Sequence, residues 1–166
     1  MKKNFFIFLG IFAALASSRF IPHPPNFTSI IALSFYVPAL LGLRYLPFLI
    51  LSFVITDIFI GYHNLTFWTW GSIILIGLIS RYFTNNIIKR LGGALIGSFI
   101  FFLITNLGVW FSGMYGHTIA GLITCFTLAV PFFAYSIIST FLFSSIIEAF
   151  YNSKIFVKFS KIKKYY

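Results

Sequence analysis

The chain has 166 residues, of which 60% are hydrophobic and only 8% charged, and its formal net charge is +10. So few polar residues cannot cover the surface of a water-soluble domain, and the composition therefore predicts an integral membrane protein with one all-α transmembrane domain over residues 1–166. The lysines cluster at the chain ends and in short connections, which favours contact with a cytoplasmic lipid surface and argues against a nucleic-acid partner.

Six apolar runs, taken in chain order, predict a six-helix bundle. Pro38 interrupts the second run, and Pro131 lies in the middle of the last, which is long enough to tilt or kink. The second and fourth runs are shorter than the ~20 residues that a perpendicular helix needs to cross the hydrocarbon layer, so a re-entrant course is the alternative for them. The runs cover residues 5–20, 30–43, 47–62, 67–80, 91–111 and 119–147, and a basic tail follows at 153–166.

The basic residues set the orientation of this predicted bundle. With six crossings that begin in the cytoplasm, Arg19 alone lies outside, which is the bias that fixes topology in membranes. Omitting one crossing would move a basic cluster outside. Both termini are therefore predicted to be cytoplasmic, in a multi-pass protein of a bacterial inner membrane. The residues predicted inside are Lys2, Lys3, Arg44, Arg81, Lys89, Arg90, Lys154, Lys158, Lys161, Lys163 and Lys164.

The first run also has features of a cleavable signal peptide. Lys2 and Lys3 precede its apolar stretch, and Ala14-Leu15-Ala16 fits a small-residue cleavage site. A retained helix explains the same residues, because Ala13 and Ser17 place small side chains one helical turn apart, the spacing of closely packed membrane helices. We favour the retained helix and keep cleavage of residues 1–16 as the alternative.

The two acidic residues are expected to behave differently. Asp57 lies within the third run, where an ionisable side chain costs ~2.5–3.5 kcal/mol on insertion scales and needs a partner or a wet cavity. Arg19, at the same predicted level, is the expected partner, either in a salt bridge that fastens two helices or in a ligand site. Glu148, near the inner end of the last run, has lysines nearby and is expected to be solvated or paired there.

All three histidines fall in the connections that are predicted to be external. His23, His63 and His117, together with Asp57, could complete a site for zinc, nickel or cobalt. Their spacing is not diagnostic, and interfacial or hydrogen-bonded roles are favoured for them. His23 is the exception, because the prolines on both sides restrict its backbone and suit a fixed ligand contact.

A second set of candidate residues lies near the outer end of the fifth run. Asn106 and Trp110 stand on one helical face at an i, i+4 spacing. With Tyr115 they could line a pocket for a flat, partly polar molecule, which would stack on the indole and hydrogen-bond to the amide. Trp68 and Trp70 could contribute to this pocket, but aromatic residues at this depth usually form the interfacial belt, which we favour for both.

The sequence contains no motif for catalysis or nucleotide hydrolysis. A Gly-rich phosphate loop, zinc-protease spacing and the Gly-x-Ser-x-Gly nucleophile elbow do not occur in it. We therefore predict a protein that is not an enzyme and carries no cofactor. Cys125 is the single cysteine and is expected to be a small packing residue.

Several motifs together resemble a known family. The run from Arg19 to Thr28, which reads Arg-Phe-Ile-Pro-His-Pro-Pro-Asn-Phe-Thr, resembles the opening signature of small bacterial membrane proteins catalogued among transport proteins. The Asp-x-x-x-Gly-x-His pattern from Asp57 to His63 resembles the third-helix motif of that family. Further likeness lies in the last two runs, at residues 106–110, 121–122 and 131–133.

That family is in turn similar, in size, topology and outward site, to the substrate-binding S components of energy-coupling-factor transporters. The resemblance implies capture of a vitamin or metal ion outside the cell, with a transmembrane coupling subunit and two cytoplasmic ATPases as partners. It also implies an acidic residue in the sixth helix near Thr140. This chain has threonine there, so any role of that acid is lost or moved.

We therefore expect an S-component-like subunit that binds a small, vitamin-like solute and hands it inward, with membrane lipids as its surroundings. One alternative is a membrane scaffold whose polar groups only lock helices together, and another is a component for transition-metal uptake. The predicted substrate-binding residues, without a metal ligand among them, are Arg19, His23, Asn26, Asp57, His63, Asn106, Trp110 and Tyr115.

Overall fold

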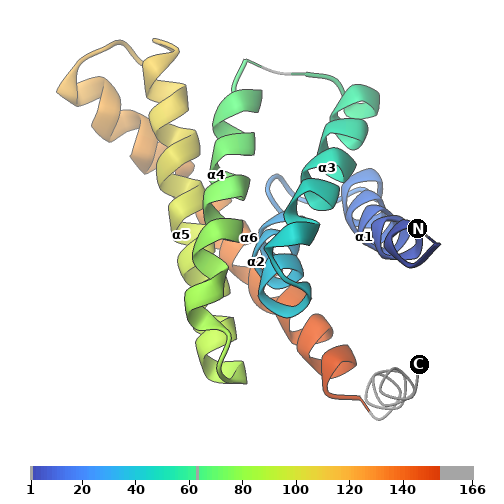
Figure 1. Ribbon diagram of the computed structural model, residues 1–166. Coiled ribbons are helices and arrows are strands. Elements are labelled where there is room, and N and C mark those ends of the chain that lie inside the picture. Colours follow the sequence, from blue (N-terminus) through green and yellow to red (C-terminus); the bar gives the residue numbers. More distant parts are fainter. Residues whose placement is uncertain (1, 63, 154–166) are drawn as a thin grey trace.

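The computed structural model of the chain describes residues 2–62 and 64–153, and these ranges are all-α, without a strand (Figure 1). Each of the six predicted runs contains one α-helix, so the prediction of six helices is confirmed for this part of the chain. Two short 3-10 helices, η1 and η2, follow α2 and α4. The elements are α1 Lys2–Phe20, α2 Ile30–Leu41, η1 Leu43–Tyr45, α3 Leu46–Ile60, α4 Thr66–Ile79, η2 Ser80–Phe83, α5 Ile87–Phe111 and α6 Ile119–Tyr151.

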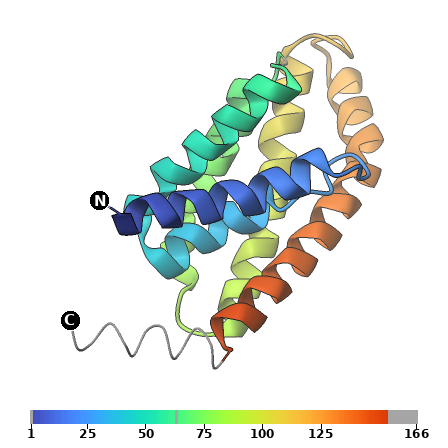
Figure 2. The same ribbon diagram turned by 90° about the vertical axis from the view of Figure 1, so that its right-hand side faces the viewer.

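Three helical segments of the described ranges are long and apolar enough to cross a membrane, which is consistent with an integral membrane protein. They are Leu43–Ile60, Ile87–Phe111 and Ile119–Tyr151. The apolar helices Asn4–Phe20 and Ile30–Leu41 are shorter. Figure 2 shows that α1 runs across the bundle in front of α2, steeply inclined to α5, and so carries its C-terminal end toward α6.

Local caps explain where the predicted helix boundaries were wrong. α2 ends before Gly42, whose φ of 100° is open to glycine and strained for other residues. α5 begins earlier than predicted because the side chain of Asn86 accepts a hydrogen bond from the backbone N–H of Lys89 at 2.9 Å. This cap extends the helix over Arg90, which the sequence places in a solvated connection.

The core is built around α2, whose residues 30–38 are all buried. A helix that is apolar on every side has to be surrounded by protein or lipid. Two glycines of α5, spaced one turn apart, allow close approach to this core. A Cβ on Gly93 would lie 2.6 Å from the ring of Phe35 on α2, and one on Gly97 would lie 3.1 Å from Ile76 on α4. In α1, by contrast, Ala13 is exposed.

Candidate functional site

A buried ion pair joins α1, α3 and α4. The Nη2 of Arg19, at the end of α1, donates to the Oδ1 of Asp57 on α3 at 2.6 Å, so the structure contains the pair that the sequence predicts. The indole N–H of Trp70 on α4 donates to the other carboxylate oxygen, Oδ2, at 2.9 Å. Arg19 also donates to the Thr56 hydroxyl, and its guanidinium lies 4.4 Å from the centre of the Phe53 ring.

Asp57 is only 2% exposed, and both of its carboxylate oxygens have donors. Sequence reasoning missed Trp70, which it assigned to the aromatic belt. The signal that could have found it is chemical: a partly buried indole carries an N–H that needs an acceptor, and Asp57 is one of only two acids in the chain. The Arg19–Asp57 pair is therefore satisfied within the protein.

Beside this pair lies a cavity of about 670 Å³. Its walls come from the end of α1, the following loop, α3, the start of α4, the C-terminal half of α5, the loop after α5 and the α6 segment from Cys125 to Ser136. Five of the eight predicted site residues line it, namely Arg19, His23, Asn26, Asn106 and Tyr115. Other residues on its walls include Phe53, Thr69, Phe102, Thr105, Cys125, Ala129, Phe133 and Ser136.

The loop between α1 and α2 is anchored so that it forms one wall of the cavity. Asn26 has a φ of 63°, a conformation that asparagine tolerates better than most residues, and its carbonyl accepts a bond from Ser139 of α6 at 3.4 Å. The Phe27 ring lies 6.4 Å from that of Phe143. His23 bonds to the carbonyl of Pro24 through Nδ1 at 2.8 Å, so this nitrogen carries the proton. The loop thereby bridges α1 to α6 past the cavity.

The wall formed by α5 and α6 combines polar and aromatic groups. The Asn106 side-chain amide donates to the carbonyl of Phe102 at 2.7 Å, and the Cys125 thiol donates to the Asn106 backbone carbonyl at 3.4 Å. The rings of Phe102 and Phe133 stack with centroids 4.5 Å apart. A flat ligand can therefore meet both an aromatic surface and an amide here.

Asp57 and Trp110 are not among the lining residues of the cavity. Asp57 contacts the lining residue Arg19. The indole N–H of Trp110 donates to the carbonyl of Thr118 at 3.1 Å and thus fastens the loop after α5 rather than facing the cavity. His117 packs edge-on against Trp110 and donates through Nε2 to the Phe111 carbonyl at 3.1 Å. His63 lies outside the described residues.

The described ranges contain no group of three or more His, Cys, Asp or Glu side chains placed to hold a metal ion. Of the histidines in these ranges, His23 lines the cavity and His117 does not. Each uses one ring nitrogen in a hydrogen bond to a backbone carbonyl.

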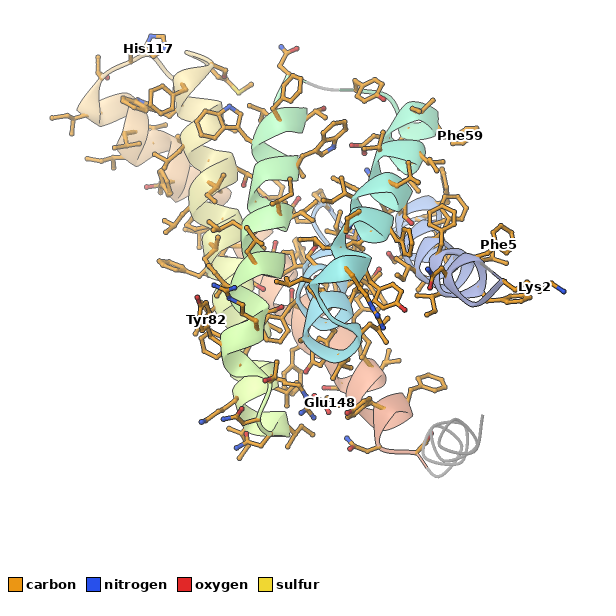
Figure 3. All side chains as sticks on the ribbon, viewed as in Figure 1. Lys2, Phe5, Phe59, Tyr82, His117 and Glu148 are labelled. Atoms are coloured by element: carbon orange, nitrogen blue, oxygen red, sulfur yellow. The ribbon has the colours of Figure 1, made fainter. Side chains whose placement is uncertain are left out.

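A second buried ion pair lies at the other end of the bundle from His117 (Figure 3). Arg90 on α5 donates through Nε and Nη2 to the two carboxylate oxygens of Glu148 on α6, at 2.6 and 2.7 Å. The two residues are 8% and 2% exposed, respectively. Arg90 also donates to the Thr84 carbonyl at 3.1 Å. The expectation that Glu148 is solvated or paired with tail lysines is thus corrected: its partner is Arg90, because the cap at Asn86 brings that residue into α5.

A family model described as a family of unknown function (DUF6580) matches residues 1–161. Comparisons with curated proteins and with solved structures each give no match.

Proposed function

This chain belongs to DUF6580, a family of unknown function whose model spans residues 1–161, and we propose that it is a membrane-embedded protein that binds a small organic solute. In this proposal it acts without catalysis, as the substrate-binding subunit of an energy-coupled importer similar to the S components of energy-coupling-factor transporters. A transmembrane coupling subunit and cytoplasmic ATPases would be its partners.

One observation carries the proposal: the cavity of about 670 Å³ lined by Arg19, His23, Asn26, Asn106 and Tyr115. Its volume lies within the range of roughly 300–1,000 Å³ that small-molecule sites occupy. Its residues come from distant parts of the chain, and their polar groups converge on a mostly apolar space. A helical scaffold needs no such space, because closely packed side chains stabilise helix contacts better than a void does.

A specific observation favours the rival role of membrane scaffold. Arg19 and Asp57 satisfy each other at 2.6 Å, and Trp70 binds the second carboxylate oxygen, so this cluster can lock α1, α3 and α4 without any ligand. The ion-pair cluster lies beside the cavity, so locking the helices together does not exclude binding a solute. The two roles are therefore separated by whether the cavity holds a molecule.

The decisive experiment is to purify the protein in lipid nanodiscs and identify co-purified small molecules and metals by mass spectrometry. Ala129→Phe fills the cavity from α6, whereas Ala134→Phe places the same side chain on the exposed face of that helix and is the matched control. We expect an organic molecule that is retained by the wild type and by Ala134→Phe and falls at least tenfold in Ala129→Phe. A scaffold gives no cavity-dependent molecule in any of the three.

The same preparations separate an organic solute from a metal. We expect Asn106→Ala to lower the amount of bound molecule more than His117→Ala, because Asn106 faces the cavity and His117 binds its own loop. Stoichiometric nickel, cobalt or zinc that is lost in a His63→Ala variant would replace the organic solute by a metal ion.

The importer role also requires that the cavity open to the outside, with six crossings and both termini in the cytoplasm of a bacterial cell. In a Cys125→Ser background, we expect a cysteine at position 23 to react with an impermeant maleimide in intact cells, and one at position 89 to react only after permeabilisation. The opposite pattern would reverse the orientation. Labelling at both positions in intact cells would remove a crossing from the proposed topology.

A further inference from the structure

The cavity next to the Arg19–Asp57 pair carries no net charge on its described walls. Arg19 is the one lining side chain in the described ranges with a permanent charge, and the Asp57 carboxylate neutralises it at 2.6 Å. Asp57 is itself held by Trp70 and is only 2% exposed. An anion could bind Arg19 only by displacing the Asp57 carboxylate. A cation could bind that carboxylate only by displacing Arg19. A charged ligand would therefore remain uncompensated in a site of low polarity, which is unfavourable.

The hydroxyl groups on the helical walls of the cavity offer acceptors rather than donors. The hydroxyl hydrogens of Thr69, Thr105 and Ser136 are used on carbonyls of their own helices, at 3.2, 2.8 and 3.1 Å. One of the two N–H hydrogens of the Asn106 side chain is used on Phe102 at 2.7 Å, and its amide oxygen has no donor among the described residues, so this amide offers an acceptor together with one N–H. A ligand N–H or O–H therefore finds several acceptors on this side.

The wall at the end of α1 offers donors. Arg19 has five N–H groups, of which the described contacts use three, on Phe53, Thr56 and Asp57. Its two remaining N–H groups lie on a side chain that lines the cavity, where they suit a neutral carbonyl oxygen. Because Asp57 already balances the charge, the guanidinium acts here as a hydrogen-bond donor and not as an anion receptor.

From this pattern we propose that the cavity takes an uncharged, mostly apolar ring compound in which a carbonyl oxygen and an N–H lie close together, as in a carboxamide, lactam, imide or cyclic urea. The carbonyl accepts from Arg19, the N–H donates to the Asn106 oxygen, and the ring lies on the stacked pair Phe102 and Phe133. The proposal rests on the proposed function, since it names the chemical class that the same cavity binds.

The test uses three probes that share one ring and differ in charge: indole-3-acetamide, indole-3-acetate and tryptamine. Binding to the protein in nanodiscs is measured by saturation-transfer NMR, and the signal that persists in Ala129→Phe is subtracted as partition into lipid. We expect the amide to give a cavity-dependent signal, and the anion and the cation to bind at least tenfold more weakly.

A second arm changes the charge of the site and keeps its shape. Asp57→Asn retains an acceptor for Trp70 and leaves Arg19 unbalanced, so we expect the preference to move by tenfold or more toward indole-3-acetate. The double variant Arg19→Gln/Asp57→Asn restores neutrality and is expected to return the preference to the amide. If Asp57→Asn does not fold, the double variant still allows the three probes to be compared at a site without the ion pair.

The possible failures are distinguishable. A cavity-dependent signal that is strongest for indole-3-acetate or tryptamine in the wild type overturns the charge assignment and leaves the proposed function standing. An unchanged preference in Asp57→Asn overturns the role given to the Arg19–Asp57 balance. No cavity-dependent signal from any probe, together with no co-purified molecule, overturns both the ligand class and the proposed function.

Discussion

Glu148→Ala is expected to destabilise the detergent-solubilised protein by about 3–5 kcal/mol, because removing one member of a buried ion pair leaves the other charge uncompensated. The stranded group is Arg90, only 8% exposed, which loses two bonds of 2.6 and 2.7 Å and keeps its bond to the Thr84 carbonyl and its position 5.4 Å from the centre of the Tyr151 ring. The pair ties the first turn of α5 to the last turns of α6. The free energy of unfolding, measured by titration with a denaturing detergent, gives the size of the loss.

Two variants establish that the loss comes from the pair. Lys89→Ala removes a positive charge next to Arg90 from an exposed position and should change the stability by less than ~0.5 kcal/mol. The double variant Arg90→Met/Glu148→Leu removes both charges and should recover a large part of the stability, since apolar groups of similar volume can replace a buried pair. If Glu148→Ala is no more harmful than Lys89→Ala, the pair has no energetic role.

The helices of this fold are predictable from the sequence because long apolar segments can be recognised from their composition. Six apolar runs gave six helices, and the errors are at ends that depend on single capping groups, as at Asn86. The course of α1 across the bundle was not predictable, because an apolar run has no feature that fixes its angle to its neighbours. That angle is set by tertiary packing and by contacts such as Arg19 with Asp57.

Some contacts of the charged and candidate-site residues were also predictable from the sequence, and others were not. Arg19 and Asp57 were predictable as partners because a membrane segment tolerates an acid only with a counter-charge or a wet cavity. Arg90 and Glu148 were missed because they are 58 positions apart and each stands near the end of an apolar run, where charges usually meet solvent. The direction of the Trp110 indole depends on a bond to the Thr118 carbonyl, a loop contact without a signal in residue spacing.

The Arg19–Asp57 pair provides a further test, in which stability and binding are read on the same variants. Asp57→Ala should cost about 3 kcal/mol, since it leaves Arg19 without its carboxylate and Trp70 without its acceptor. Adding Arg19→Leu should restore ~1–2 kcal/mol, because residues in direct contact are energetically coupled. Arg44→Ala is the matched control, because it removes an exposed arginine that stacks on Tyr45.

Strict additivity of the two substitutions would contradict the energetic coupling of the pair, whatever their separate costs. Coupling in stability with unchanged probe binding in the double variant would mean that the pair serves only to hold α1 on α3. Coupling in stability together with a loss of the indole-3-acetamide signal would mean that Arg19 also donates to the ligand, because Leu supplies no N–H to the carbonyl while leaving the cavity uncharged. We expect coupling together with a loss of the indole-3-acetamide signal, since Arg19 lines the cavity with two N–H groups that have no partner among the described residues.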